Sequence, residues 1–391
     1  MNSFERVKAA QHFQNPDKVP VFNLVMGDIL PLPIIHSRKW RPGWAENEHG
    51  LFPHVIRGYK WDRPDWAKKP EFEGDTWRTV PHEEVDEWGS IWNMSGREDN
   101  MGHPGRPVLA DWDQLEQYKA QYKLEARDES RFILCKRLLE STKEDDKKYR
   151  LVIYAFGLFE RACKIRGFNN CLIDHRRNPG KLKELLEFIT DYHIQLIDTC
   201  IDYDLQPHGF MIAEDLGEQS RPLMSPKIFK KIYEPFYRRI FDRVHEHGCD
   251  FVIHSCGKMD ALIPPLIEWG LDAIEFDSPR MCGYKDLQKF RGKIMMWGCV
   301  NIQSIYVNGT PEEVEREVWH MVRNLGTKHG GFGAYFYSEP KVLRAPKKNI
   351  RAFKRGLEKY GVYSQIPENW WDYPVEEEWN DNIVPPLPPS E

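Results

Sequence analysis

The feature that most constrains the fold is a regular alternation of short apolar runs with amphipathic helical stretches after residue 149. The apolar runs are residues 149–156, 209–215, 250–257, 271–277, 293–301 and 331–337. Helices are predicted between and after them, the clearest at 225–247, 261–269, 311–325 and 346–360. Short, nearly continuous apolar strands that alternate with helices are typical of a parallel sheet covered on its faces.

The number of these strands favours one α/β architecture. Six strands follow residue 149, and one or two more are expected before it, the first at Val19–Val25. Seven or eight strand–helix units are best accommodated by a (β/α)8 TIM barrel. A doubly wound open sheet is the alternative, but no Gly-x-Gly-x-x-Gly follows any of the strands, which argues against a dinucleotide site.

The sequence predicts one domain with three stretches, which differ in how regularly strands and helices alternate. Residues 1–124 are predicted to be irregular and aromatic-rich, and to contribute the first strand or strands and a lid. Residues 125–365 form the main body of the barrel, and residues 366–391 form a polar, proline-rich tail. The alternating pattern of Val85–Asn93 predicts a single strand within the first stretch. Its aromatic side chains are expected either to line a substrate pocket or to pack a lid.

Composition excludes several classes of protein. Of the 391 residues, 41% are hydrophobic, which is enough for a sizeable core and excludes a disordered chain. The net charge of −5, without a long basic run, gives no reason to expect nucleic-acid binding. We expect neither a membrane helix nor a signal peptide. The eight scattered cysteines predict reduced thiols in a cytoplasmic protein.

Polar residues end nearly every apolar run, where the carboxyl ends of the barrel strands would lie. These residues are Glu160, Arg161, Glu214, Asp215, His254, Cys256, Asp277, Asn301, Tyr337, Ser338 and Glu339. Active sites of (β/α)8 barrels lie at these strand ends. A succession of such groups therefore predicts a functional site. The alternative for any single residue is that it is polar only because strand ends contact water.

His254-Ser255-Cys256 is the most specific element of this set. Residues i and i+2 of a strand point to the same face, so the imidazole and the thiolate can converge on one cation. Zinc accepts this pair, and a catalytic zinc needs three protein ligands and one open position. Glu214 and Glu339 are the candidates for the third ligand. The alternative is that His254 makes a hydrogen bond inside the mouth while Cys256 is a buried apolar group.

The adjacent carboxylates Glu214 and Asp215 are expected to point to opposite faces of their strand, so that one of them faces the barrel mouth. Asp215 there could hold a cationic or pyrrole-type N–H group or accept a proton, whereas Glu214 could reach the metal. Arg161 is expected either to bind an anionic group of the substrate or to pair with Glu160 of its own loop.

Several segments together resemble the uroporphyrinogen decarboxylase family in its broad sense, which includes the decarboxylase and the zinc-dependent corrinoid and coenzyme M methyltransferases. These segments are Phe4–Val7, Asp17–Val21, Asp86–Gly89, Gly157–Arg161, Glu214–Gln219, Leu223–Pro226, His254–Gly257, Trp297–Asn301, Gly309–Val314 and Gly330–Gly331. The resemblance covers residues 149–362 and, more loosely, the part before them. It implies a (β/α)8 barrel without fixing one activity.

Two departures from the family's patterns bear on the activity. The decarboxylase carries an arginine-rich segment after its first strand, but residues 23–28 here contain no arginine to receive propionates. The methyltransferases resemble this chain at His254 and Cys256, but they carry a third cysteine after the last strand, where this chain has Tyr337–Pro340. The resemblance therefore implies a zinc site in which Glu339, or Glu214, replaces the missing thiolate.

The resemblance implies a zinc-dependent methyltransferase that moves a methyl group between a small methylated substrate and a corrinoid. A methoxyarene, which would undergo O-demethylation, is one expected substrate. Asp215 and Glu214 are the predicted catalytic carboxylates, and Arg161, Asn301, Tyr337 and Gln219 are the predicted substrate-binding residues.

Two alternatives and a set of partners complete these expectations. One alternative is a metal-free decarboxylase that holds its substrate with Asp215 and Arg161; the second is a barrel without turnover that binds a corrinoid or tetrapyrrole. The expected partners are a small-molecule substrate, a corrinoid protein and a second copy of the chain in a homodimer, with no nucleic acid and no membrane.

Overall fold

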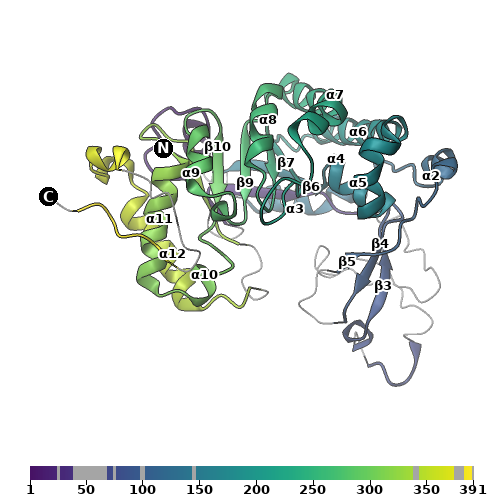
Figure 1. The fold of residues 1–391 in the computed structure, drawn as a ribbon, viewed down its shortest axis with the longest axis horizontal. Helices are drawn as coiled ribbons and strands as arrows, with labels where there is room; N and C mark the ends of the chain where they lie inside the picture. The colour runs from purple at the N-terminus through teal and green to yellow at the C-terminus, as the bar shows by residue number, and fades with distance from the viewer. Residues whose placement is uncertain are drawn as a thin grey trace. The chain divides into compact units, whose positions relative to one another are not determined.

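The computed structural model describes residues 1–23, 27–37, 68–73, 76–96, 102–142, 147–337, 343–373 and 383–389 (Figure 1). The chain forms two compact units, each built from segments that are separate in the sequence. The first unit consists of Met1–Leu32, Leu139–Ala155 and Gln206–Glu391, and the second of Pro33–Leu138 and Phe156–Leu205. The division at residues 124 and 365 that the sequence suggests stays a prediction.

The first unit is built on an eight-stranded sheet whose order is β1-β11-β10-β9-β8-β7-β6-β2. The strands are β1 (Val21–Phe22), β2 (Ile29–Pro33), β6 (Tyr149–Phe156), β7 (Gly209–Ala213), β8 (Asp250–His254), β9 (Ala273–Phe276), β10 (Met295–Gly298) and β11 (Phe332–Tyr335). Neighbouring strands from β7 to β9 and from β9 to β11 are parallel, as are β11 and β1. β1 and β2 stand at the two ends of this strand order. The backbone N–H of Asp28, just before β2, donates to the carbonyl of Val21 in β1 at 2.7 Å and so joins these two ends. The predicted (β/α)8 barrel is confirmed.

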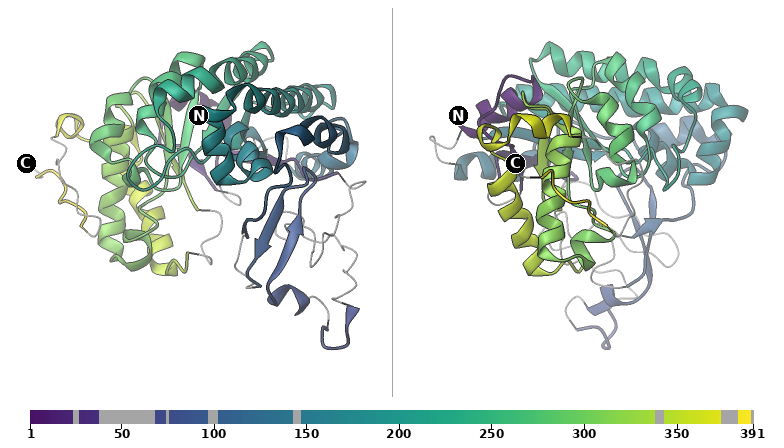
Figure 2. Two further views of the ribbon diagram at one scale, coloured as in Figure 1. Left: turned by 45° about the vertical axis from the view of Figure 1, so that its right-hand side comes forward. Right: turned by 60° about the vertical axis from the view of Figure 1, so that its left-hand side comes forward.

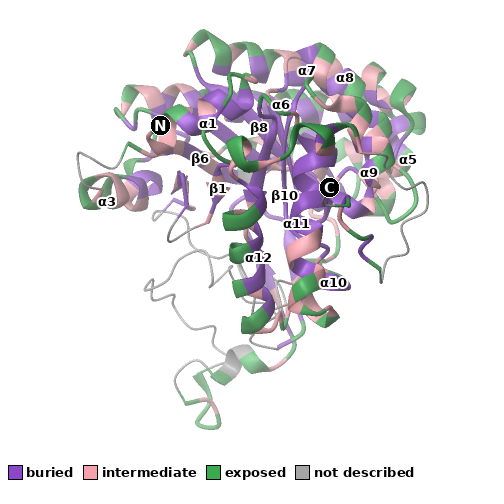
Figure 3. Ribbon diagram, turned by 90° about the vertical axis from the view of Figure 1, so that its left-hand side faces the viewer, coloured by how far each residue is buried: buried purple, intermediate pink, exposed green. Residues whose placement is uncertain are grey.

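Two of the helices that follow these strands begin where the sequence predicts. α7 (Pro226–Glu246) has Ser225 as its N-cap and a proline in its first turn. α11 (Pro311–Leu325) begins with a capping box between Thr310 and Glu313. α8 (Ile263–Trp269), α9 (Tyr284–Leu287), α10 (Ile305–Asn308) and α12 (Lys347–Tyr360) complete the series after β8. Figure 3 shows buried residues along one side of α12 and exposed residues along its opposite side.

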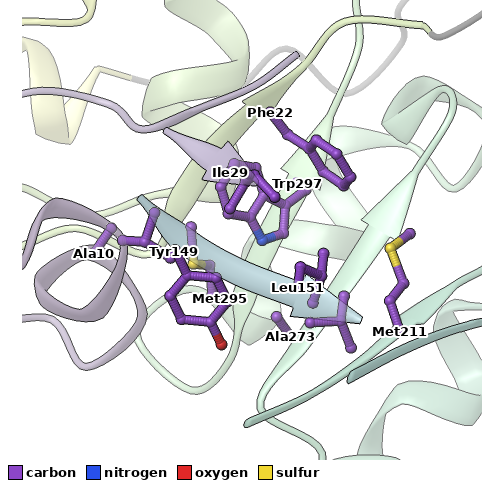
Figure 4. Close-up of a cluster of buried hydrophobic side chains, with 11 residues drawn as sticks. Ala10, Phe22, Ile29, Tyr149, Leu151, Met211, Ala273, Met295 and Trp297 are labelled. Atoms are coloured by element: carbon purple, nitrogen blue, oxygen red, sulfur yellow. The ribbon is translucent and has the colours of Figure 1, made fainter. Parts of the chain in front are cut away.

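Apolar side chains from most of the strands fill the barrel interior (Figure 4). Phe22, Ile29, Tyr149, Leu151, Met211, Val252, Ala273, Met295 and Trp297 belong to this cluster. Gly333 leaves room for the ring of Trp297, because a Cβ at this position would lie 2.2 Å from a ring carbon. The interior is therefore a packed core, and the chemistry is confined to its ends.

The second unit contains a three-stranded antiparallel sheet and a group of helices (Figure 2). The strands are β3 (His82–Val85), β4 (Ile91–Met94) and β5 (His103–Pro104), and the helices are α2 (Leu115–Gln121), α3 (Ile133–Ser141), α4 (Leu158–Arg166), α5 (Phe168–Arg177) and α6 (Pro179–Asp202). α1 (Ser3–Gln11) belongs to the first unit. Among the described residues, none of the helices combines the length and the apolar character needed to cross a bilayer.

The predicted single strand Val85–Asn93 is wrong, because a tight turn interrupts it. β3 ends at Val85 and β4 begins at Ile91, and the two strands pair with each other. Asp86 Oδ1 accepts hydrogen bonds from the backbone of Trp88 and of Ser90, both at 2.9 Å. Gly89 adopts a φ of 73°, which side-chain-bearing residues rarely adopt. The alternation of side chains resembled one strand, whereas the chain folds back on itself.

Candidate metal centre

The carboxyl ends of β7, β8 and β9 bring five side chains into one cluster. They are Asp215 after β7, His254 and Cys256 at the end of β8, and Glu275 and Asp277 at the end of β9. Ligand atoms of Asp215, His254 and Cys256 lie within 4.8 Å of one another, and those of His254, Glu275 and Asp277 do so as well. We call these five residues the metal-ligand cluster.

Strand register and loop contacts hold this cluster together. In the parallel sheet, Ala213 pairs with His254, and His254 pairs with Glu275, so the three strands end at one level. The backbone N–H of Cys256 donates to Asp215 Oδ1 at 2.9 Å, which joins the loop after β8 to the loop after β7. Gly257 permits this close approach: its φ is 80°, and a Cβ there would lie 2.3 Å from the carbonyl oxygen of Gly217.

The distances within the cluster fit a tetrahedral zinc site. His254 Nε2 lies 3.6 Å from Cys256 Sγ and 3.6 Å from Asp215 Oδ1. Cys256 Sγ lies 3.4 Å from Asp277 Oδ2. With a Zn–S bond of about 2.3 Å and Zn–N and Zn–O bonds of about 2.0 Å, tetrahedral ligand atoms lie about 3.3–3.6 Å apart. Nitrogen, sulfur and carboxylate oxygen are also the ligand types that zinc prefers, so these residues fit the metal.

Burial and neighbouring charges shift the pKa values of three side chains of the cluster. Burial raises the pKa of the Cys256 thiol to about 12 and the pKa of the Glu275 carboxyl to about 7. Burial alone would lower the pKa of His254, but the charge of Glu275 and hydrogen bonds with Cys256 and Glu275 raise it well above its ordinary value. A divalent cation would reverse the effect on the thiol, because a coordinating thiol is deprotonated.

Of the two adjacent carboxylates after β7, only Asp215 belongs to this cluster. Its side chain is 45% exposed and faces His254. Glu214 is fully buried, and its carboxylate accepts a hydrogen bond from Tyr237 of α7. Glu214 is thus not part of the metal-ligand cluster, and its role as a metal ligand or catalytic residue stays a prediction. Glu339, the other predicted third ligand, lies outside the described residues.

Three predicted substrate-binding residues lie outside the cluster. Asn301 is 5% exposed, and its side-chain oxygen accepts hydrogen bonds from the backbone of Gln303 and Ser304, so it caps the loop after β10. Gln219 is exposed in the loop after β7, and Tyr337 is half-buried just after β11. Their binding roles stay predictions.

Arg161 occupies a buried position in the second unit. Its guanidinium donates to Asp86 Oδ2 at 2.6 Å, and the two side chains are 2% and 1% exposed. Glu160, the partner expected from the sequence, pairs instead with Lys164 at 2.6 Å. The structure thus places Arg161 in an internal ion pair rather than at an exposed anion site, because a residue some 75 positions away supplies its carboxylate.

The sequence prediction missed Glu275. Glu275 lies within the apolar run 271–277, and it is a charged residue in a strand whose four residues are all buried. A charge in the middle of such a run is the signal that could have identified it, since a buried carboxylate needs a specific partner.

The comparisons with known proteins agree with this fold. The sequence profile of the uroporphyrinogen decarboxylase (URO-D) family matches residues 96–334. A methylated-thiol–coenzyme M methyltransferase of Methanosarcina mazei is 24% identical over 156 residues, which span 40% of this chain and 40% of that protein. The match thus covers well under half the length of this curated relative.

A solved structure has the same overall fold. The structure of a methyltransferase from Methanosarcina mazei aligns with a TM-score of 0.56 over 92% of this chain and 99% of that chain. The sequences are 14% identical, so this likeness shows the fold alone.

Proposed function

Because the chain belongs to the uroporphyrinogen decarboxylase family, and its barrel carries a histidine, a cysteine and carboxylates in one cluster, we propose that it is a zinc-dependent methyltransferase. The reaction would move a methyl group between a small methylated substrate and a corrinoid. The sequence similarity to a methyltransferase of Methanosarcina mazei supports the reaction class.

The observation that carries this proposal is the spacing of the donor atoms of Asp215, His254 and Cys256. We assign these three residues as the zinc ligands, with Asp215 in place of the third cysteine of the related methyltransferases. Three protein ligands leave one position for the substrate. Zinc bound there would act as a Lewis acid on the heteroatom that loses or gains the methyl group.

The other residues of the cluster would support these ligands. Asp277 accepts a hydrogen bond from the thiol of Cys256 at 3.4 Å. Its carboxylate is thus placed to take up the thiol proton when the sulfur binds a cation. Asp215 is the more exposed carboxylate of the site, so its second oxygen can also orient an incoming substrate.

The substrate and the corrinoid are the finer part of the proposal. The curated relative is named for a methylated thiol and coenzyme M. We propose a small methylated compound, with methoxyarenes and methylated thiols as the two classes to compare. A corrinoid protein would be the partner that carries the methyl group.

A spectroscopic assay tests the proposal. The purified, zinc-loaded protein is mixed with cob(I)alamin and with a methoxyarene, dimethyl sulfide or methanol, and the formation of methylcobalamin is followed by absorbance. We expect turnover with at least one donor, and loss of at least 100-fold in Cys256→Ala. Cys249→Ala is the matched control, because that thiol lies before β8, at the opposite end of the strand, and bonds to the carbonyl of Pro207. Transfer that persists undiminished in Cys256→Ala, or under a strong chelator, would refute the proposal.

A further inference from the structure

Glu275 is placed unusually for a carboxylate. It is the third of the four residues of β9, between Ile274 and Phe276, and it is 1% exposed. Taking a carboxylate out of water is costly unless a partner compensates for the lost hydration. A glutamate in a strand of this kind therefore needs a specific reason to be there.

Its partner is the imidazole of His254. The two residues are directly paired in the register of β8 and β9, so their side chains lie on the same face of the sheet. His254 Nδ1 donates a hydrogen bond to Glu275 Oε2. Glu275 Oε1 makes no hydrogen bond within the described part of the chain. The imidazole of His254 is therefore the hydrogen-bond partner of this carboxylate among the described residues.

This contact determines which ring nitrogen can bind a cation. Because Nδ1 is engaged by Glu275, the ring presents Nε2 to Cys256 Sγ and to Asp215 Oδ1, each at 3.6 Å. A carboxylate on the second ring nitrogen fixes the orientation of the imidazole and makes the first nitrogen a stronger donor. Residues in this position typically contribute about 10–100-fold to metal affinity.

We propose that Glu275 is a positioning residue of the metal centre, which holds His254 with Nε2 directed at the cation without binding the cation itself. This inference rests on the proposed function, since it assumes that zinc occupies the cluster. It assigns a role to a residue that no family motif in the sequence marks.

Zinc affinity, measured by competition with a chromophoric chelator, tests the proposal without any activity assay. Glu275→Leu removes the acceptor and should weaken zinc binding about 10–100-fold. Glu275→Gln keeps an oxygen that can accept from Nδ1 and should weaken binding less, by about threefold to tenfold. The visible spectrum of the cobalt(II)-substituted protein should keep its intensity in Glu275→Gln.

Glu317→Gln is the matched control, because it makes the same change at another fully buried glutamate of the barrel. The carboxylate of Glu317 accepts hydrogen bonds from Tyr284 and from the backbone of Asn301, outside the metal-ligand cluster. Its zinc affinity should equal that of the wild type.

Each outcome decides the matter. Affinity that falls in the order wild type, Glu275→Gln, Glu275→Leu, with Glu317→Gln unchanged, supports the proposal. Three results would overturn it: equal zinc affinity in all the proteins, an equal loss of affinity in Glu317→Gln, or complete loss of zinc from Glu275→Gln, as expected for a ligand variant. None of these results would contradict the proposed zinc site of the wild type. A wild type that binds no zinc would overturn the proposed function as well.

Discussion

Replacing Arg161 by methionine tests whether this residue is part of the packing of the second unit. Its guanidinium lies 2.6 Å from Asp86 and 5.0 Å from the ring centroid of Trp88. Removing one partner of a buried ion pair costs about 3–5 kcal/mol, because the remaining charge is left buried. The backbone N–H groups of Trp88 and Ser90 still compensate the Asp86 carboxylate, so we expect the lower end, about 3 kcal/mol.

Urea denaturation at pH 7, followed by tryptophan fluorescence, measures this loss of unfolding free energy. Asp86→Asn and the double variant with Arg161→Met complete a cycle, which should give a coupling energy of roughly 2–3 kcal/mol. Arg127→Met is the control, because Arg127 forms an exposed ion pair with Asp202, with the two side chains 60% and 51% exposed. Its loss should stay below about 1 kcal/mol.

The reasoning fails if Arg161→Met loses no more stability than Arg127→Met. If the variant keeps its stability and instead raises KM for an anionic substrate, that result would support the sequence-based prediction that Arg161 binds an anionic group of the substrate.

Further predictions concern the stability of the folded chain. Burial lowers the pKa of His320 to about 4. Between about pH 6.5 and pH 4, His320 is therefore protonated in the unfolded chain but neutral in the folded chain. The free energy of unfolding should fall as the pH drops through this range, by roughly 2 kcal/mol at pH 5. Urea midpoints at pH 7 and pH 5 should therefore differ less in His320→Gln than in the wild type, and an identical difference would contradict this. Gly333→Ala should cost about 1–3 kcal/mol, because the added Cβ meets the ring of Trp297. Gly180→Ala, which meets nothing within 4 Å, should not lower the melting temperature, and equal melting temperatures for the two variants would count against the packing argument.

Local patterns in the sequence sufficed to predict most of the barrel. The predicted helix 311–325 is α11 from end to end, because Thr310 and Pro311 define its start and its apolar residues repeat with helical spacing. The strand predicted at 149–156 is β6 without change. Caps, periodicity and apolar runs depend on neighbours in the chain, which a sequence displays directly.

Contacts between distant segments could not be predicted in this way. Asp86 pairs with Arg161, although the sequence offered Glu160 as a nearer partner. Whether Glu214 or Asp215 faces the site depends on the residue at which β7 ends. A shift of one residue along the strand would move each of the two side chains to the opposite face of the sheet. Glu275 acquires its role only from the register of β9 against β8. The sequence therefore pointed to the strand ends where the metal-ligand cluster lies, but which carboxylates join that cluster depends on contacts between distant segments.

The zinc content of the purified protein tests the central claim most directly. Elemental analysis of the wild type, His254→Ala, Cys256→Ala and Cys249→Ala should find one zinc per chain in the wild type and in Cys249→Ala, and none in the two ligand variants. A wild type without zinc after exposure to the metal, or zinc that remains when His254 or Cys256 is replaced, would contradict the assignment of these residues as ligands.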